Sequence, residues 1–197
     1  GRGITPGMPE DDERLDAMIA TLKRTAAALR DAGVPFAVAG GMAVWARGAP
    51  VRDTDVDVVV TKGDLPRAVA VLEEAGMKTV DPPEEWLAKA HDGDVTVDII
   101  VAPSGIEITP DVLGRAEELE VEAVAMPVLP IEDVLVTQLL SMTERHMTYE
   151  GLIETARAVR EQVDWDGVRR RTDHDPFARA FFTITEGLGI VPPPSSG

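Results

Sequence analysis

Apolar positions recur along the chain at two periods, and each period predicts a different kind of element. Between residues 10 and 32 they lie three or four residues apart, the spacing of one helix face, and Gly33 ends this segment. Shorter runs rich in valine and isoleucine alternate every second residue, as in strands with one buried face. The pattern predicts further helices over 42–47, 65–75 and 110–119, and strands over 35–39, 54–60, 77–80, 86–90, 95–101 and 121–128.

Beyond residue 130 the pattern is helical almost to the end of the chain. The expected helices cover 131–146, 149–163, 166–171 and 176–188. A mixed sheet followed by helices indicates an α+β fold, with helices on one face of the sheet and a C-terminal helical bundle after it. We therefore expect two parts, a catalytic core over 10–129 and a helical region over 130–190.

Two of the predicted strands carry carboxylates on the face opposite their aliphatic side chains. Asp55 and Asp57 lie two residues apart in one strand, so they share a face at roughly 6 to 7 Å. In the strand 95–101, Asp98 likewise lies on the face opposite the alternating aliphatic residues. If these two strands are neighbours that bury the same face, Asp98 joins the other two acids.

Carboxylates that share a face at short range repel one another, so this pattern indicates a bound cation. Three converging carboxylates can hold one or two Mg²⁺ ions, which prefer oxygen ligands and bridge to substrate phosphates. The alternative is that Asp55 and Asp57 are solvated strand residues and that Asp98 is an edge charge.

A glycine pair, Gly40 and Gly41, opens the short helix that precedes the acidic strand. Two glycines between a strand and a helix let backbone N–H groups approach a phosphate closely. Tight turns also use such pairs, so the signal is weak by itself. Arg52 and Thr54 lie just before the acids and are candidates to contact phosphate or to support the strand. Arg47 is a further candidate, with a surface arginine as the alternative.

The composition narrows the classes of function. The net charge of -16, from 35 acidic and 19 basic residues, argues against a protein that coats nucleic acid. The local basic cluster Arg169–Arg171 could still bind an RNA acceptor, and a solvated helix face, with acids interspersed, is the favoured alternative. There is no cysteine for disulfides or thiolate ligation. No apolar run approaches the roughly 20 residues of a membrane span, and no secretory signal is visible, so a cytoplasmic protein is expected.

The glycine pair, the Asp55-x-Asp57 pair and the later Asp98 together resemble the motif of the polymerase-β-type nucleotidyltransferase superfamily. Within it, residues 34 to about 145 are similar to minimal bacterial nucleotidyltransferases, among them AbiEii and MenT-like toxins and antibiotic-modifying enzymes. The resemblance implies transfer of a nucleoside monophosphate from a Mg²⁺-bound nucleoside triphosphate, such as ATP, to a hydroxyl acceptor, with release of pyrophosphate.

The resemblance also implies roles for individual residues. Asp55 and Asp57 would bind metal, and Asp98 would share the metal and help activate the acceptor hydroxyl. Gly40 and Gly41 would cradle the triphosphate. The acceptor would be an RNA 3′ end such as that of tRNA, a small hydroxylated molecule or a protein side chain. A toxin would in addition have an antitoxin protein as its partner.

The chain departs from the superfamily pattern at two places. Superfamily members often have serine where Gly41 stands, and the AbiEii-like toxins have lysine where Gln138 stands. Two alternatives therefore stay open at this point. One is a catalytically weak or inactive domain of this fold that binds nucleotide or a partner protein. The other is a glycosyltransferase whose Asp-x-Asp pair holds a metal and a sugar nucleotide.

Overall fold

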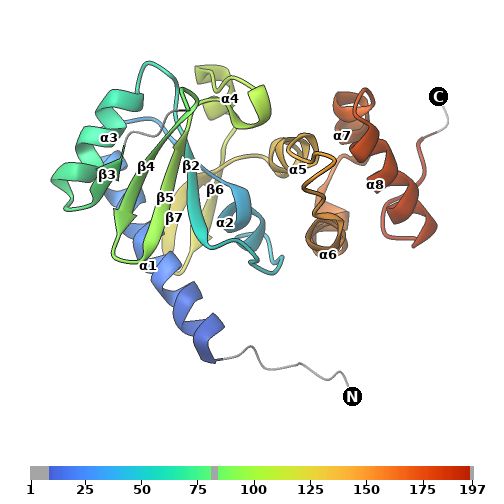
Figure 1. Cartoon of the computed structure of the whole chain (residues 1–197), viewed down its shortest axis with the longest axis horizontal. Coiled ribbons are helices and arrows are strands. Elements are labelled where there is room, and N and C mark those ends of the chain that lie inside the picture. Colours follow the sequence, from blue (N-terminus) through green and yellow to red (C-terminus); the bar gives the residue numbers. More distant parts are fainter. Residues whose placement is uncertain (1–8, 81–83, 196–197) are drawn as a thin grey trace.

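A mixed seven-stranded sheet forms the centre of the structure, a computed structural model that describes residues 9–80 and 84–195 (Figure 1). The strands stand in the order β3-β4-β5-β2-β1-β7-β6. Two neighbouring pairs, β2 with β5 and β1 with β7, are parallel, and the others are antiparallel. The bounds are β1 Ala37–Ala39, β2 Asp55–Val59, β3 Lys78–Val80, β4 Leu87–Asp92, β5 Val95–Ile100, β6 Glu117–Val121 and β7 Val124–Val128.

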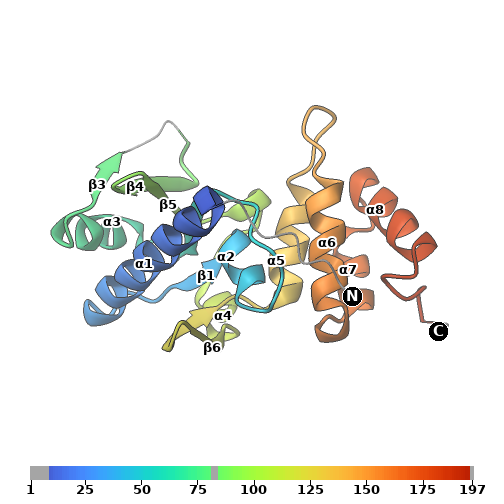
Figure 2. The same cartoon turned by 90° about the horizontal axis from the view of Figure 1, so that it is seen from below.

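Two helices cover the aliphatic face of this sheet. The helices α1 (Pro9–Asp31) and α3 (Leu65–Glu74) lie side by side against β2, β4 and β5 (Figures 1 and 2). The strand residues on this face have no solvent exposure, namely Val56, Val58, Val97 and Ile99. Since alternate side chains of a strand point to opposite faces, the residues between them are left on the other face, where α1 and α3 do not lie.

The remaining helices build the other side of the molecule. The short helices α2 (Gly40–Trp45) and α4 (Pro110–Gly114) flank the sheet, with the 3₁₀ turn η1 (Pro103–Gly105). Four helices follow the sheet, α5 (Ile131–Leu140), α6 (Tyr149–Val159), α7 (Trp165–Thr172) and α8 (Pro176–Gly187), with the 3₁₀ turn η2 (Arg160–Gln162). The α+β class, with a mixed sheet and a helical C-terminal region, is confirmed.

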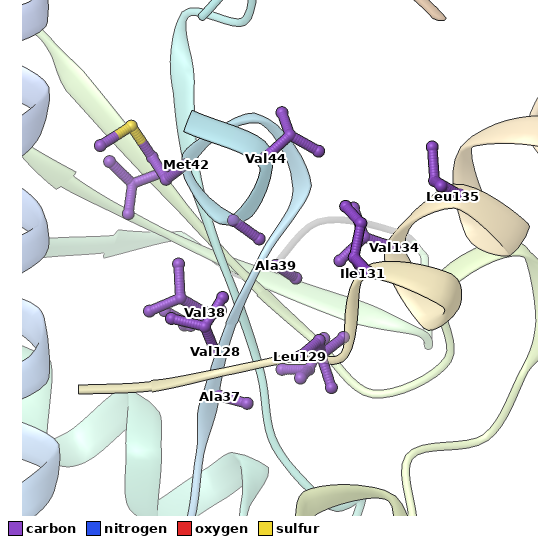
Figure 3. Packing of buried hydrophobic residues seen from close by; sticks show 14 of the residues in the cluster. Ala37, Val38, Ala39, Met42, Val44, Val128, Leu129, Ile131, Val134 and Leu135 are labelled. Atoms are coloured by element: carbon purple, nitrogen blue, oxygen red, sulfur yellow. The ribbon is translucent and has the colours of Figure 1, made fainter. Parts of the chain in front are cut away.

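Helix α5 joins the two sides. It packs against α2 and η1 and also against α7 and α8. Figure 3 shows Ile131 and Val134 of α5 near Val44 and Ala39, and all four belong to one apolar cluster that extends from α1 to α8. The division into two domains near residue 129 stays a prediction, since this cluster continues across it.

Three of the expected elements have wrong bounds. The helix expected over 110–119 ends at Gly114. The single strand expected over 121–128 covers the turn of the hairpin β6–β7 and its second arm, and the first arm, β6, was not expected. The hairpin turns at Glu122 and Ala123, which have φ angles of 47° and 64°. Such turns are usually marked by Gly, Asn or Asp, and none is present here. The first C-terminal helix is also shorter than expected and ends at Leu140.

Within the ranges that the structure describes, no helix combines the length and the apolar character needed to cross a membrane.

Candidate active site

Three carboxylates come to the sheet face opposite α1 and α3. The strands β2 and β5 are parallel neighbours whose register pairs Asp57 with Asp98 and Asp55 with Thr96. Neighbouring strands lie about 4.8 Å apart, so Asp57 and Asp98 stand side by side on one face. Asp55 precedes Asp57 by two residues and shares this face. The alternating pattern of the two strands therefore does bring the three acids together on one face of the sheet. Their roles in the reaction stay predictions.

A cleft of about 1030 Å³ opens on this side of the sheet. The start of α2 lines it at Gly40 and Gly41, and α5 lines it at Gln138. Helix α6 contributes Glu150. Among the three carboxylates only Asp57 belongs to the described lining of the cleft. The cleft is large enough for a nucleotide, because ligand pockets commonly measure about 300–1,000 Å³.

The carboxyl group of Asp57 is difficult to ionise. Desolvation, followed by the negative charges of Asp98, Asp53 and Asp55, raises its pKa to about 8. The charge of Lys89 acts in the opposite direction without cancelling the effect. Across residues 9–80 and 84–195, no salt bridge ends on Asp57 or Asp55. A divalent cation would supply the missing compensation, and carboxylate oxygens are the ligands that Mg²⁺ prefers.

Asp98 has a different environment, because a lysine already compensates its charge. Lys89 is the register partner of Asp98 on the neighbouring strand β4, and its Nζ lies 2.6 Å from Asp98 Oδ1. Although partial burial acts in the opposite direction, the hydrogen bond and charge of Asp98 raise the pKa of Lys89. In the described part of the chain, no three Asp, Glu, His or Cys side chains stand ready to hold a metal. The donor chemistry thus fits a hard cation at Asp55 and Asp57, with Asp98 engaged elsewhere.

The glycine pair lies directly against two carboxylates. Gly40 has a φ of 56°, and a Cβ added there would stand 1.9 Å from Asp57 Oδ2. A Cβ on Gly41 would stand 2.5 Å from Asp53 Oδ2. Each glycine therefore has a packing reason to lack a side chain, and contact with phosphate stays a prediction for both.

Asp53 is a further acid of the cleft, and sequence reasoning missed it because it lies in a loop without periodicity. Partial burial raises the pKa of Asp53, a hydrogen bond from the Gly41 backbone opposes the rise, and the charge of Asp55 adds to it. Sequence reasoning also missed Lys89, although the register of the predicted hairpin is enough to place it opposite Asp98. Once Asp92 pairs with Val95, Lys89 must pair with Asp98.

Two residues predicted to bind nucleotide make other contacts. Arg52 lines the cleft, and its guanidinium binds Glu154 of α6, with Nε and Nη2 at 2.8 and 2.6 Å from Oε2. Glu150 lies 3.7 Å from the same Nη2. Thr54 is exposed and its hydroxyl lies 3.4 Å from Asp55 Oδ1. A role of Arg52 at a phosphate would require it to leave Glu154, whereas Thr54 is placed to support the acid strand.

Gln138 and Arg47 both carry buried polar groups on their side chains. Gln138 lines the cleft, and its buried Oε1 has no hydrogen-bond partner within the described ranges. Arg47 is not a surface residue, because its side chain is 4% exposed, and contact with phosphate stays a prediction for it. Its guanidinium donates hydrogen bonds to the carbonyl oxygens of Ala43 and Leu129, the latter at 2.7 Å. Arg47 thus ties α2 to the end of β7.

Replacing Arg47 by alanine should lower the free energy of unfolding by about 2–3 kcal/mol, because two buried carbonyl groups lose a charged donor. Urea unfolding measures this loss. Arg170→Ala is the matched control, since the side chain of Arg170 is 72% exposed and its stability should change by less than about 0.5 kcal/mol. Equal stability of the two variants would contradict the structural role of Arg47.

Comparison with known proteins identifies the class to which this fold and its acidic cleft belong. The model of the family described as "uncharacterised nucleotidyltransferase" matches residues 12–188. The chain belongs to this family of nucleotidyltransferases, and it is an enzyme of that class. No curated protein matches the sequence.

Solved structures show the same fold at low sequence identity. ANT(2″)-Ia in complex with adenylyl-2″-tobramycin is 14% identical with a TM-score of 0.59, and the match covers 84% of this chain and 99% of that one. The solution structure of ANT(2″)-Ia gives 15% identity, a TM-score of 0.58 and coverages of 88% and 96%. The Thermotoga maritima protein TM1012, described as a "putative nucleotidyltransferase", is 17% identical with a TM-score of 0.50, and the match covers 81% of this chain and 97% of that one. At such identities the likeness establishes the fold alone.

Proposed function

We propose that the chain transfers a nucleoside monophosphate from a nucleoside triphosphate to a hydroxyl group of a small molecule, with release of pyrophosphate and dependence on Mg²⁺. The observation that carries the proposal is the register of β2 and β5, which sets Asp57 beside Asp98 at a cleft of nucleotide size. Membership of a nucleotidyltransferase family supports the reaction class.

The three carboxylates have different roles in this proposal. Asp55 and Asp57 hold the divalent ion, for which the uncompensated charge around Asp57 is the support. When bound, Mg²⁺ supplies charge neutralisation of the triphosphate and polarisation of the attacked phosphorus. Asp98 faces the acceptor and takes the proton of its hydroxyl as the new bond to phosphorus forms.

The remaining lining residues hold the nucleotide. The backbone around Gly40 and Gly41 faces the triphosphate, although the Gly41 N–H already donates a hydrogen bond to Asp53. Arg52 lines the same cleft, and Thr54 supports Asp55. Trp86 lines the same cleft with 44% of its surface exposed, so it offers a flat apolar face on which a nucleobase can stack. Gln138 lines the cleft as well, and its side-chain Oε1 has no hydrogen-bond partner among the described residues.

The charges around the cleft favour a small acceptor over RNA. Asp53, Asp57 and Glu150 line the cleft, and Arg52 is compensated by Glu154. Beyond the place of the Mg²⁺-bound triphosphate, such a surface repels the phosphate backbone of an RNA acceptor and accepts neutral or cationic molecules. ANT(2″)-Ia, which shares the fold, was solved with adenylyl-2″-tobramycin, a nucleotidylated small molecule.

The arginines considered for RNA binding are engaged with acids instead. Arg169 is 16% exposed, pairs with Asp166 and Glu186, and lies over the ring of Phe182. Arg171 pairs with Asp133 at 2.7 Å. These contacts leave little free positive charge on α7 for a phosphate backbone. Because RNA is not favoured as the acceptor, we do not assign to the chain a toxin role that acts on RNA, nor an antitoxin partner.

Transfer of label from each α-labelled nucleoside triphosphate tests the proposal. The protein is incubated with Mg²⁺ and either a panel of amino sugars and other polyhydroxylated small molecules or a tRNA pool. We expect a labelled small molecule with the native chain and none with the double variant Asp55→Ala/Asp57→Ala. Label in tRNA alone would overturn the choice of acceptor. Absence of label in both pools, with intact protein, would contradict the proposed function.

A further inference from the structure

Three charged residues form a row across three neighbouring strands. Asp57 on β2 pairs in register with Asp98 on β5, and Asp98 pairs with Lys89 on β4. All three side chains therefore project from the same face, at successive strand spacings of about 4.8 Å. The row places a permanent cation inside the acidic centre, immediately beside the third carboxylate.

The contact between the lysine and the third acid is close and partly buried. Lys89 Nζ lies 2.6 Å from Asp98 Oδ1, and the two side chains are 34% and 16% exposed. Partly buried ion pairs are screened less by salt than surface pairs, and a charge-assisted hydrogen bond holds this one in place. Asp98 is thus oriented by Lys89, and one of its two oxygens is already occupied.

The other two acids show the opposite arrangement. Within residues 9–80 and 84–195, Asp55 and Asp57 take part in no salt bridge, and no ready three-ligand metal group exists there. A divalent ion near Asp55 and Asp57 would therefore lie beside negative charge that no described salt bridge compensates. A second ion near Asp98 would lie next to an ammonium group and would be repelled by it.

We propose that Lys89 takes the place of a second divalent ion beside Asp98, so that the nucleotide-loaded centre holds one divalent ion, at Asp55 and Asp57. This inference rests on the proposed function, since it assigns the cations of that same site. Lys89 acts through Asp98 and is a positioning residue. It keeps Asp98 Oδ1 fixed and leaves Oδ2 for the acceptor hydroxyl.

Counting bound ions tests this directly. Mn²⁺ stands in for Mg²⁺, and the paramagnetic resonance signal of free Mn²⁺ is followed during titration of the protein with a non-hydrolysable α,β-methylene nucleoside triphosphate, the protein being in excess over nucleotide. We expect one Mn²⁺ per nucleotide complex for the native chain and for Lys89→Arg. We expect two for Lys89→Met, because the place beside Asp98 becomes free. The double variant Lys89→Met/Asp98→Asn should return to one.

The outcomes separate this inference from the function on which it rests. Two Mn²⁺ ions in the native complex, with transfer of label intact, would overturn the inference and leave the proposed function standing. One ion in both the native chain and Lys89→Met would also overturn it. No bound ion together with no transfer would remove both. Thermal melts show whether Lys89→Met folds, and the native and Lys89→Arg counts decide the matter if it does not.

Discussion

Replacing Asp57 by asparagine should abolish nucleotidyl transfer and at the same time stabilise the ligand-free protein. The loss of activity follows because asparagine removes the negative charge that holds the divalent ion, and we expect at least a 10³-fold decrease, about 4 kcal/mol of transition-state stabilisation. The gain in stability follows because the native carboxyl group is ionised only at a cost, its pKa being raised to about 8.

The stabilisation should depend on pH in a defined direction. Between the ordinary pKa of 3.8 and the raised pKa of about 8, the folded protein keeps a proton on Asp57 that the unfolded chain has lost. Folding therefore binds a proton, and the contribution of Asp57 to the free energy of unfolding falls as the pH rises through this window. The Asp57→Asn variant lacks this titration, so the two proteins should differ little near pH 4 and most near pH 8.

Thermal melts of the ligand-free proteins between pH 4 and 8 measure this effect. After allowance for partial solvation, we expect an advantage of about 1–3 kcal/mol for Asp57→Asn near pH 8, which is a rise of a few degrees in Tm. Asp16→Asn is the matched control, since it makes the same change on an exposed position of α1 and should leave the difference flat with pH. A variant less stable than the native protein at pH 8 would show that the charge around Asp57 is not a burden on the fold.

The juxtaposition of the acids was predictable because it depends on a period of two residues. In both β2 and β5 the aliphatic residues occupy alternate positions, so one buried face forces Asp57 and Asp98 onto the other. Two assumptions were needed, that the strands are neighbours and that they bury the same face of the sheet. The strand order, with β2 placed between β5 and β1, could not be read from parity and came from the structure.

The parts that escaped prediction depend on contacts between distant segments or on unmarked turns. Arg47 becomes buried because the carbonyl of Leu129, far along the chain, comes within 2.7 Å of its guanidinium. Arg52 is drawn to α6 by Glu154, which lies 102 residues later. The hairpin β6–β7 turns at Glu122 and Ala123, where side-chain chemistry gives no turn signal. In each case the local sequence is compatible with several outcomes, and tertiary packing selects one.

Replacing Gly40 by alanine should damage the site more than the fold, and a second glycine of the same chain allows the two effects to be separated. At Gly40 a Cβ would lie 1.9 Å from Asp57 Oδ2, so the carboxyl group must move by about an ångström or more. A misplacement of that size at a reacting centre can cost roughly 10²-fold in rate. The positive φ of 56° adds about 1–2 kcal/mol of backbone strain.

Gly33 is the matched control for this substitution. Its φ of 65° imposes similar strain on alanine, but a Cβ there would meet nothing within 4 Å. Gly33→Ala should therefore lose about 1–2 kcal/mol in urea unfolding and keep native turnover at temperatures where it is folded. Gly40→Ala should show a comparable or larger loss of stability together with the roughly 10²-fold fall in kcat/KM for label transfer. If both variants kept native turnover, the contact between Gly40 and Asp57 would have no part in the reaction, because strain alone is common to the two positions.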